Sequence, residues 1–132
     1  MKTISFAVPC FNSADYMEKC VDSLLPCGED IEIILVNDGS TKDNTAEIAD
    51  ALAEKYPSIV KAIHKKNGGH GSAVNTGLEA ATGLYYKVVD SDDWLDEQSM
   101  KTIMDYLRSQ REKAEKGSSV TDLVISNYVY EK

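Results

Sequence analysis

The chain alternates between two patterns of hydrophobic and polar positions. Short apolar runs, which predict buried strands, occur at residues 3–8, 31–36, 59–64, 84–89 and 122–129. Between them, apolar residues recur at spacings of three and four, the period of one helix face. The clearest such set is Met17, Cys20, Val21 and Leu24. The order β-α-β-α-β-α-β-α-β predicts an α/β fold with a mostly parallel sheet and helices on both faces.

Capping residues predict where two of the helices begin and end. The first helix is expected to have Asn12 or Ser13 as its N-cap, because both side chains can accept a hydrogen bond from a free backbone N–H. The third helix is expected over residues 73–81, with Ser72 at its start and Gly83 beyond its end.

The composition favours a single globular domain that does not bind nucleic acid. Of the 132 residues, 42% are hydrophobic and 27% charged, as in folded domains. Lys and Arg number 14 and Asp and Glu 22, so the net charge is −8. Nucleic acids and anionic membranes both require a basic surface, so we expect neither as a partner. An acidic protein that binds phosphates must attract them locally, with a cation or with backbone N–H groups.

The cysteines and the amino terminus bear on the location of the protein. Cys10, Cys20 and Cys27 are odd in number and lack the paired spacing of a zinc site. We expect buried free thiols in a reducing compartment. The first residues do not resemble a signal peptide, and no run approaches the ~18 apolar residues of a membrane span. The sequence predicts a cytoplasmic protein, with attachment to the inner face of the membrane left to a further C-terminal part.

Polar residues follow four of the predicted strands. In a parallel sheet the carboxyl ends of the strands share one edge, and ligands bind there. Side chains that are far apart in the sequence are therefore expected to converge. The segments concerned are residues 9–12, 37–40, 65–70 and 90–94.

The sequence Asp90-Ser91-Asp92-Asp93 is the most specific feature of this edge. Three carboxylates in four residues repel one another unless a cation lies among them. Mg²⁺ is commonly held by one or two carboxylates together with a diphosphate, so this D-x-D pattern suits a metal–diphosphate site. The alternative is structural: Asp93 caps the next helix and the other acids are solvated.

Weaker candidates lie in the neighbouring loops. Asp38 could accept hydrogen bonds from a base or sugar, or only stabilise a turn before a helix. The glycine-rich loop at 66–71 could bring backbone N–H groups to an anion, or serve as a flexible connector. His70 is a candidate hydrogen-bond donor to phosphate, or an exposed loop residue. Phe11 could stack on a base or belong to the core.

These four segments together resemble one family. V-P-C-F-N ends the first strand, I-I-L-V-N-D-G-S-T ends the second, K-N-G-G-H-G-S-A-V-N-T-G forms the glycine-rich loop and V-V-D-S-D-D-W ends the fourth strand. The pattern resembles the inverting nucleotide-sugar glycosyltransferases of family two, which have the GT-A fold. The resemblance extends from about residue 3 to residue 95 and continues weakly to residue 129.

The resemblance implies roles for the matching residues. Asp38 resembles the acid that hydrogen-bonds the nucleotide base, usually uracil, and Phe11 the aromatic residue beside that base. Asp92 resembles the metal-binding acid and Asp90 its companion near the ribose and the metal, with Mn²⁺ or Mg²⁺ as cofactor. Val74 stands where many relatives carry Arg. This removes a possible contact to phosphate or base, so the preferred nucleotide sugar is not defined by the resemblance. The nucleotide-binding residues expected on this basis are Pro9, Phe11, Asn12, Asp38, Lys66, Gly69, Asp90 and Ser91.

The implied reaction is transfer of a hexose from a nucleoside-diphosphate sugar, expected to be a UDP-sugar, to an acceptor hydroxyl with inversion. Cell-envelope polysaccharide synthesis is the expected setting, and the acceptor could be a glycan, a lipid or a protein. Between Leu95 and Lys132 no residue matches the general base of the family. We therefore expect residues 1–132 to be the donor-binding part of a truncated domain, inactive alone, with the general base and the acceptor part beyond Lys132.

Two other functions remain open from the sequence. One is a non-catalytic module of the same fold that binds a nucleotide sugar. The other is a phospho-acceptor or cofactor-binding α/β domain that draws its acids from the same strand ends. Since Asp90 and Asp92 form a tandem pair rather than one isolated strand-end acid, the sequence favours the glycosyltransferase.

Overall fold

The computed structural model of the chain describes residues 2–115, 130 and 131. Within this part, strands and helices follow the order that the sequence predicts, except that a short additional strand stands between the fourth strand and the last helix. The strands are β1 (Ile4–Cys10), β2 (Ile31–Asp38), β3 (Val60–Lys65), β4 (Tyr85–Val88), β5 (Trp94–Leu95) and β6 (Tyr130–Glu131). The helices are α1 (Met17–Leu24), the short 3₁₀ turn η1 (Leu25–Cys27), α2 (Thr45–Lys55), α3 (His70–Ala80) and α4 (Glu97–Glu115).

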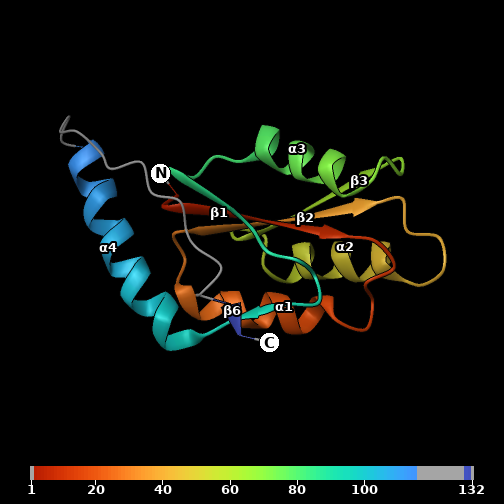
Figure 1. The fold of residues 1–132 in the computed structure, drawn as a ribbon, viewed down its shortest axis with the longest axis horizontal. Helices are drawn as coiled ribbons and strands as arrows, with labels where there is room; N and C mark the ends of the chain where they lie inside the picture. The colour runs from red at the N-terminus through yellow and green to blue at the C-terminus, as the bar shows by residue number, and fades with distance from the viewer. Residues whose placement is uncertain (1, 116–129, 132) are drawn as a thin grey trace.

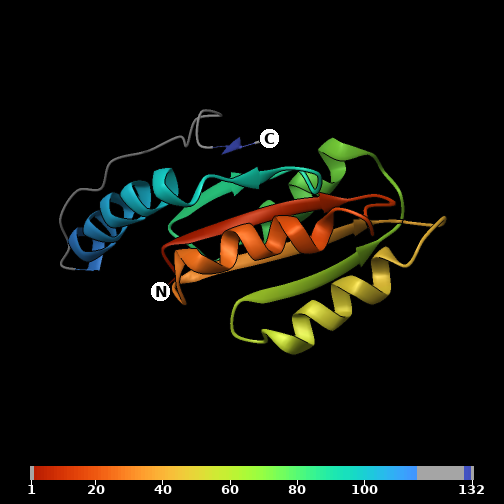
Figure 2. The ribbon, with the colours of Figure 1, turned by 90° about the horizontal axis from the view of Figure 1, so that it is seen from below.

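Four strands form a parallel sheet in the order β3-β2-β1-β4. Figure 1 shows α3 on one face of this sheet and α1 and α2 on the other, and Figure 2 views the face covered by α1 and α2. The helix α4 lies toward the end at which the strands begin. The short strands β5 and β6 pair antiparallel to each other. The predicted α/β class with helices on both faces is confirmed.

The strand β2 shows why a nearly continuous apolar run predicts a strand that is buried on both faces. Its side chains alternate between two buried layers. Ile31, Ile33 and Leu35 belong to the main core, which includes the apolar faces of α1 and α4. Ile34 and Val36 pack with Ala73 beneath α3. Because both faces are covered, both sets must be apolar, and each fully buried side chain of this size contributes about 1.5–3 kcal/mol.

Gly77 lets α3 approach the sheet closely. A Cβ at this position would lie 2.7 Å from the Cβ of Ala7 and 3.1 Å from the hydroxyl of Tyr86. The missing side chain therefore sets the distance between the helix and β1. This close packing fixes the body of α3, and with it the position of the helix start at the carboxyl edge.

The predicted helix starts are wrong by a few residues. The N-cap of α1 is Tyr16, with no side-chain cap, rather than Asn12 or Ser13. The backbone carbonyl of Ser13 instead accepts the N–H groups of Tyr16 and Met17, which forms a turn ahead of the helix. The helix α3 begins at His70 rather than after Ser72, and its N-cap is Gly69.

Glycine at position 69 explains this earlier start. Its φ of 94° is one that residues with a side chain rarely adopt, so the chain can turn there directly into the helix. At the other end, the C-cap of α3 is Ala81 rather than Gly83. The predicted strand at 122–129 lies outside the described residues. Among the helices that the structure describes, none combines the length and the apolar character needed to cross a membrane.

Candidate functional site

A cavity of about 630 Å³ lies at the carboxyl edge of the sheet. The end of β2, the segments that follow β1, β3 and β4, and the start of α3 contribute to its wall. The predicted site residues that line it are Pro9, Phe11, Asn12, Asp38, Gly69, Asp90, Ser91 and Asp92. Cys10, Asn67 and His70, which also line it, belong to the segments expected to converge, whereas the sequence did not single out Ser13, Tyr16 and Ala73. The convergence of the four strand ends is thus observed, and Lys66 is the one predicted residue that does not line the cavity.

Asp38 is the last residue of β2 and is only 4% exposed. Its Oδ1 accepts hydrogen bonds from Lys65 Nζ at 2.8 Å and from the Gly68 N–H at 2.9 Å. Its Oδ2 accepts one from the Gly69 N–H at 2.9 Å. A carboxylate offers about four acceptor positions, so one position on Oδ2 remains. Burial opposes ionisation of Asp38, but the bonds from Lys65, Gly68 and Gly69 outweigh it and lower the pKa of the carboxyl.

Lys65, and not the predicted Lys66, contacts Asp38, although neither lysine lines the cavity. Lys65 ends β3, opposite Asp38 in the parallel register, and its Nζ also donates to the backbone carbonyl of Lys66 at 2.7 Å. The side chain of Lys66 is exposed and outside the cavity. Neighbouring residues of a strand point to opposite faces, so a shift of one residue decides which lysine meets the carboxylate. Only the register of β2 and β3 carries that signal.

The loop after β1 is tied to the loop after β2. Asn12 has a φ of 51°, in the left-handed region that Asn tolerates better than most residues. Its N–H donates to Ser40 Oγ at 3.0 Å, and its Oδ1 accepts the N–H groups of Thr41 and Lys42 at 3.1 Å each. The side chain of Asn12 therefore fixes the wall of the cavity, and its contacts are with protein.

Two exposed aromatic side chains, Phe11 and Tyr16, line the cavity. Phe11 is 50% exposed and Tyr16 is 55% exposed. Phe11 is therefore not part of the core, which answers one alternative left open by the sequence. Large apolar side chains normally gain about 1.5–3 kcal/mol from burial, and aromatic faces in a cavity offer a surface for a flat ring.

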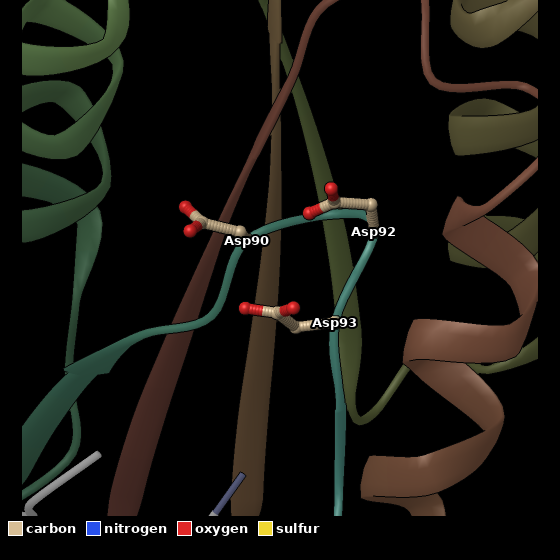
Figure 3. A group of neighbouring side chains, drawn as sticks. All are labelled: Asp90, Asp92 and Asp93. Atoms are coloured by element: carbon tan, nitrogen blue, oxygen red, sulfur yellow. The ribbon is translucent and has the colours of Figure 1, made fainter. Parts of the chain in front are cut away.

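The three acids after β4 come together in space. Asp90, Asp92 and Asp93 each present a carboxylate oxygen within 4.8 Å of the others. Figure 3 shows the Asp92 and Asp93 carboxylates directed back across the turn toward Asp90. Asp90 and Asp92 are exposed, whereas Asp93 is 5% exposed. Its backbone N–H donates to the Asp90 carbonyl at 2.9 Å, which closes the turn.

These acids fit a divalent cation by their chemistry. Carboxylate oxygens are the donors that Mg²⁺ and Mn²⁺ prefer, and mutual repulsion of the acids is relieved by a cation. The two exposed acids, Asp90 and Asp92, leave room for a ligand to share the ion. In the part of the chain that the structure describes, this is the one group of three acids, histidines or cysteines with such spacing.

His70 joins the two sides of the cavity. It is the first residue of α3, and its Nε2 lies 3.1 Å from Asp90 Oδ1, across 20 residues of sequence. Figure 3 shows the Asp90 carboxylate directed toward the side of α3. From the sequence, His70 is expected in a loop and without a defined partner, because nothing in the local pattern relates it to Asp90.

The comparisons with known proteins agree with this geometry. The sequence model described as glycosyl transferase family 2 matches residues 5–122. The chain belongs to glycosyltransferase family 2. It is 48% identical over 93 residues to the uncharacterized glycosyltransferase EpsJ of Bacillus subtilis, a match covering 70% of this chain and 26% of EpsJ. It is 40% identical over 127 residues to glycosyltransferase GlyG of Streptococcus pneumoniae, covering 95% of this chain and 38% of GlyG.

A solved structure shares the fold. TarS of S. aureus in complex with UDP-GlcNAc superimposes with a TM-score of 0.67 at 29% identity, covering 84% of this chain and 32% of that chain. The fold of this family 2 chain is accordingly of the GT-A type. The chain spans less than two fifths of the length of EpsJ, GlyG or TarS.

Proposed function

We propose that this chain carries the donor site of an enzyme that transfers a sugar from a nucleoside diphosphate, with UDP as the expected nucleotide, to an acceptor hydroxyl. One observation carries the proposal: a single cavity joins Asp38, with one free acceptor position, to the acid cluster of Asp90 and Asp92. A nucleotide sugar presents the matching groups, with a flat base at one end and a diphosphate at the other. The complex of TarS with UDP-GlcNAc supports this choice of ligand class.

The base end is assigned to Asp38 and Phe11. Uracil has one N–H between two carbonyl groups, and the remaining acceptor position of Asp38 Oδ2 suits such a donor. Phe11, half exposed in the cavity, offers a ring face on which the base can stack, a contact worth about 1–3 kcal/mol in other nucleotide complexes. Lys65 and the backbone of Gly68 and Gly69 hold the Asp38 carboxylate in place.

The diphosphate end is assigned to Asp90 and Asp92, which would hold a Mn²⁺ or Mg²⁺ ion. Such an ion supplies positive charge that offsets the negative charge developing on the departing diphosphate. The chain has a net charge of −8, so an anionic ligand needs this local attraction. Inversion at the sugar belongs to the same proposal, because the family resemblance implies it.

The general base and the acceptor site are proposed to lie in a part of the whole protein beyond Lys132. A base is needed to take the proton of the attacking hydroxyl, and the cavity of the described residues contains the donor-binding groups instead. A cell-envelope polysaccharide is the proposed setting. The three buried free cysteines support a reducing, cytoplasmic location.

A binding experiment tests the donor site. The melting temperature of this chain should rise with UDP and Mn²⁺ together and remain unchanged with NAD. Asp92→Ala should remove the part of the shift that depends on Mn²⁺ and leave the melting temperature without ligand nearly unchanged, because Asp92 is exposed. Asp22→Ala, which removes an exposed acid of α1, is the matched control for charge. Absence of any shift with nucleoside diphosphates would refute the proposal.

A further inference from the structure

His70 occupies a position that the assigned site does not yet use. It lines the same cavity as Asp38 and Asp90, and its side chain is 64% exposed. Its Nε2 lies 3.1 Å from Asp90 Oδ1, and the Asp90 side chain is 54% exposed. Asp90 is one of the two acids assigned to the cation. His70, at the start of α3, thus orients the carboxylate of Asp90.

The surroundings of His70 favour an anion. The backbone N–H of Ala73 donates to the carbonyl of Gly69 at 3.1 Å and opens the helical hydrogen-bond series of α3. The N–H groups of the residues before it, at the positive end of the helix dipole, point out of the helix start. In this structure the anion beside His70 is the Asp90 carboxylate. A phosphate group of a ligand presents the same charge and the same kind of acceptor oxygen.

The orientation of Asp90 indicates that its hydrogen bond to His70 competes with cation binding. Its carboxylate is directed toward the side of α3, and one of its oxygens lies within 4.8 Å of a carboxylate oxygen of Asp92. To close on one ion together with Asp92, the Asp90 carboxylate has to turn slightly, and this turn weakens its hydrogen bond to His70. When Asp90 turns away, a phosphate oxygen beside Nε2 takes its place as the hydrogen-bond acceptor of His70. The exchange needs both the ion and the phosphate, so it links the binding of one to the binding of the other.

We propose that His70 binds the diphosphate of the donor, and that its hydrogen bond to Asp90 is then replaced by one to a phosphate oxygen. His70 thereby couples nucleotide binding to cation binding. The inference rests on the proposed donor site and adds a residue and a coupling to it. Without ligand, His70 holds the Asp90 carboxylate toward the side of α3. With UDP and a divalent ion, His70 donates its Nε2–H to a phosphate oxygen, and Asp90 turns toward Asp92.

The coupling predicts opposite effects of one substitution. In His70→Ala, Asp90 is released, so Mn²⁺ alone should bind about threefold more tightly. UDP in the presence of Mn²⁺ should bind about tenfold more weakly, because a hydrogen bond to a charged phosphate is lost. Uridine, which has no phosphate, should bind as it does to the unmodified chain. Calorimetric titration of the chain at one fixed pH measures all three affinities.

Two further variants separate binding from structure. His70→Gln keeps an N–H donor at the end of the side chain and should restore most of the affinity for UDP. The other histidine of the chain, His64, lies with its Nε2 2.7 Å from Asp50 Oδ1 and does not line the cavity. His64→Ala, the matched control, should leave the affinities for Mn²⁺ and UDP unchanged.

The outcomes distinguish this inference from the proposed function. If the unmodified chain binds neither uridine nor UDP, the donor site itself is misassigned and the inference falls with it. Suppose that the unmodified chain binds UDP, and that the affinities of His70→Ala for Mn²⁺ and for UDP equal those of the unmodified chain. Then only the role of His70 is refuted. Weaker binding of Mn²⁺ and of UDP together in His70→Ala would mean that the residue merely supports the fold of the loop.

Discussion

The strand β2 carries a buried carboxylate near each end, and the two are built in the same way. Glu32 is 2% exposed and Asp38 is 4% exposed, and their spacing along the strand places both on the face covered by α3. Each is paired with a lysine of β3, Glu32 with Lys61 at 2.6 Å and Asp38 with Lys65 at 2.8 Å. Burial and ion pairing therefore do not distinguish them.

Each carboxylate also holds the backbone at one end of α3. Asp38 accepts the N–H groups of Gly68 and Gly69, which precede the helix. Glu32 accepts the N–H of Thr82, which follows it, at 2.9 Å. One strand thus fixes both connections of the helix that lines the cavity.

The difference lies in the number of acceptor positions left over. Glu32 accepts four hydrogen bonds, one from Ser5 Oγ, two from Thr82 and one from Lys61. These use all of its roughly four acceptor positions. Asp38 accepts three, and it alone of the two lines the cavity. A spare acceptor position at a cavity, rather than burial or a salt bridge, marks the carboxylate that can bind a ligand.

The largest effect is expected from Glu32→Ala. The substitution leaves the buried Ser5 hydroxyl without its acceptor and removes both hydrogen bonds from Thr82, and an unsatisfied buried donor costs about 1–3 kcal/mol. Because Lys61 is half exposed, its charge can return to water and adds little, so we expect a total loss of about 3 kcal/mol. Urea unfolding followed by circular dichroism measures the loss.

Lys61→Ala is the matched control for this change. It removes the exposed partner only, and the remaining three hydrogen bonds still satisfy Glu32, so the loss should be clearly smaller. Uridine affinity of the folded Glu32→Ala chain should equal that of the unmodified chain. A strong loss of uridine affinity would show that the two ends of β2 are not separate in function.

Asp38→Asn should have the opposite effect to Glu32→Ala, with a smaller loss of stability and a larger loss of uridine affinity. The amide group keeps one acceptor oxygen but turns donors toward Lys65 or the glycine N–H groups, so we expect a loss of about 1–2 kcal/mol in stability. Uridine affinity should fall by at least tenfold, because the carboxylate that accepts the base N–H is gone. Calorimetry and urea unfolding of the same sample separate the two quantities. An unchanged uridine affinity would contradict the assignment of the base end.

Acid should destabilise the end of β2 that carries Glu32. Burial opposes ionisation of Glu32, but hydrogen bonds from Lys61, Thr82 and Ser5 outweigh it and lower the pKa of the carboxyl. Hydrogen bonds from Arg108 lower the pKa of Asp30, the residue just before β2, to about 2. A lowered pKa in the folded state means stability that is present at neutral pH and lost as the pH falls.

For Asp30 the loss should amount to about 2 kcal/mol between pH ~4 and pH ~2. Urea unfolding at pH 6, 4 and 2.5 measures it. Asp30→Asn should lower stability at pH 6 and flatten the dependence on pH over this range, because the titrating group is absent. An equally steep acid limb in Asp30→Asn would assign the loss to other carboxylates.

Asp38 is recognisable in the sequence and Glu32 is not, for a physical reason. Asp38 lies at a strand end beside glycine and serine, where polar residues are expected to meet a ligand. Glu32 interrupts an apolar run, and its partners Ser5 and Thr82 are 27 and 50 residues away. Lys65 and the His70–Asp90 contact are hidden for the same reason. Strand period and strand ends are local properties, whereas cross-strand register and contacts between loops depend on how the elements pack.

The smallest effects should come from two glycines of α3, and they sharpen the contrast between its fixed body and its open start. In Gly77→Ala the new Cβ would lie 2.7 Å from Ala7 Cβ, and such overpacking costs about 1–3 kcal/mol. At Gly71 a Cβ meets nothing within 4 Å, and alanine favours a helix by up to about 1 kcal/mol over glycine. Gly71→Ala should therefore be neutral or stabilising in urea unfolding, and Gly77→Ala destabilising by about 1 kcal/mol after the same helix preference is subtracted. Equal effects at both positions would mean that α3 can shift on the sheet, so that the close packing at Gly77 would not fix the start of the helix.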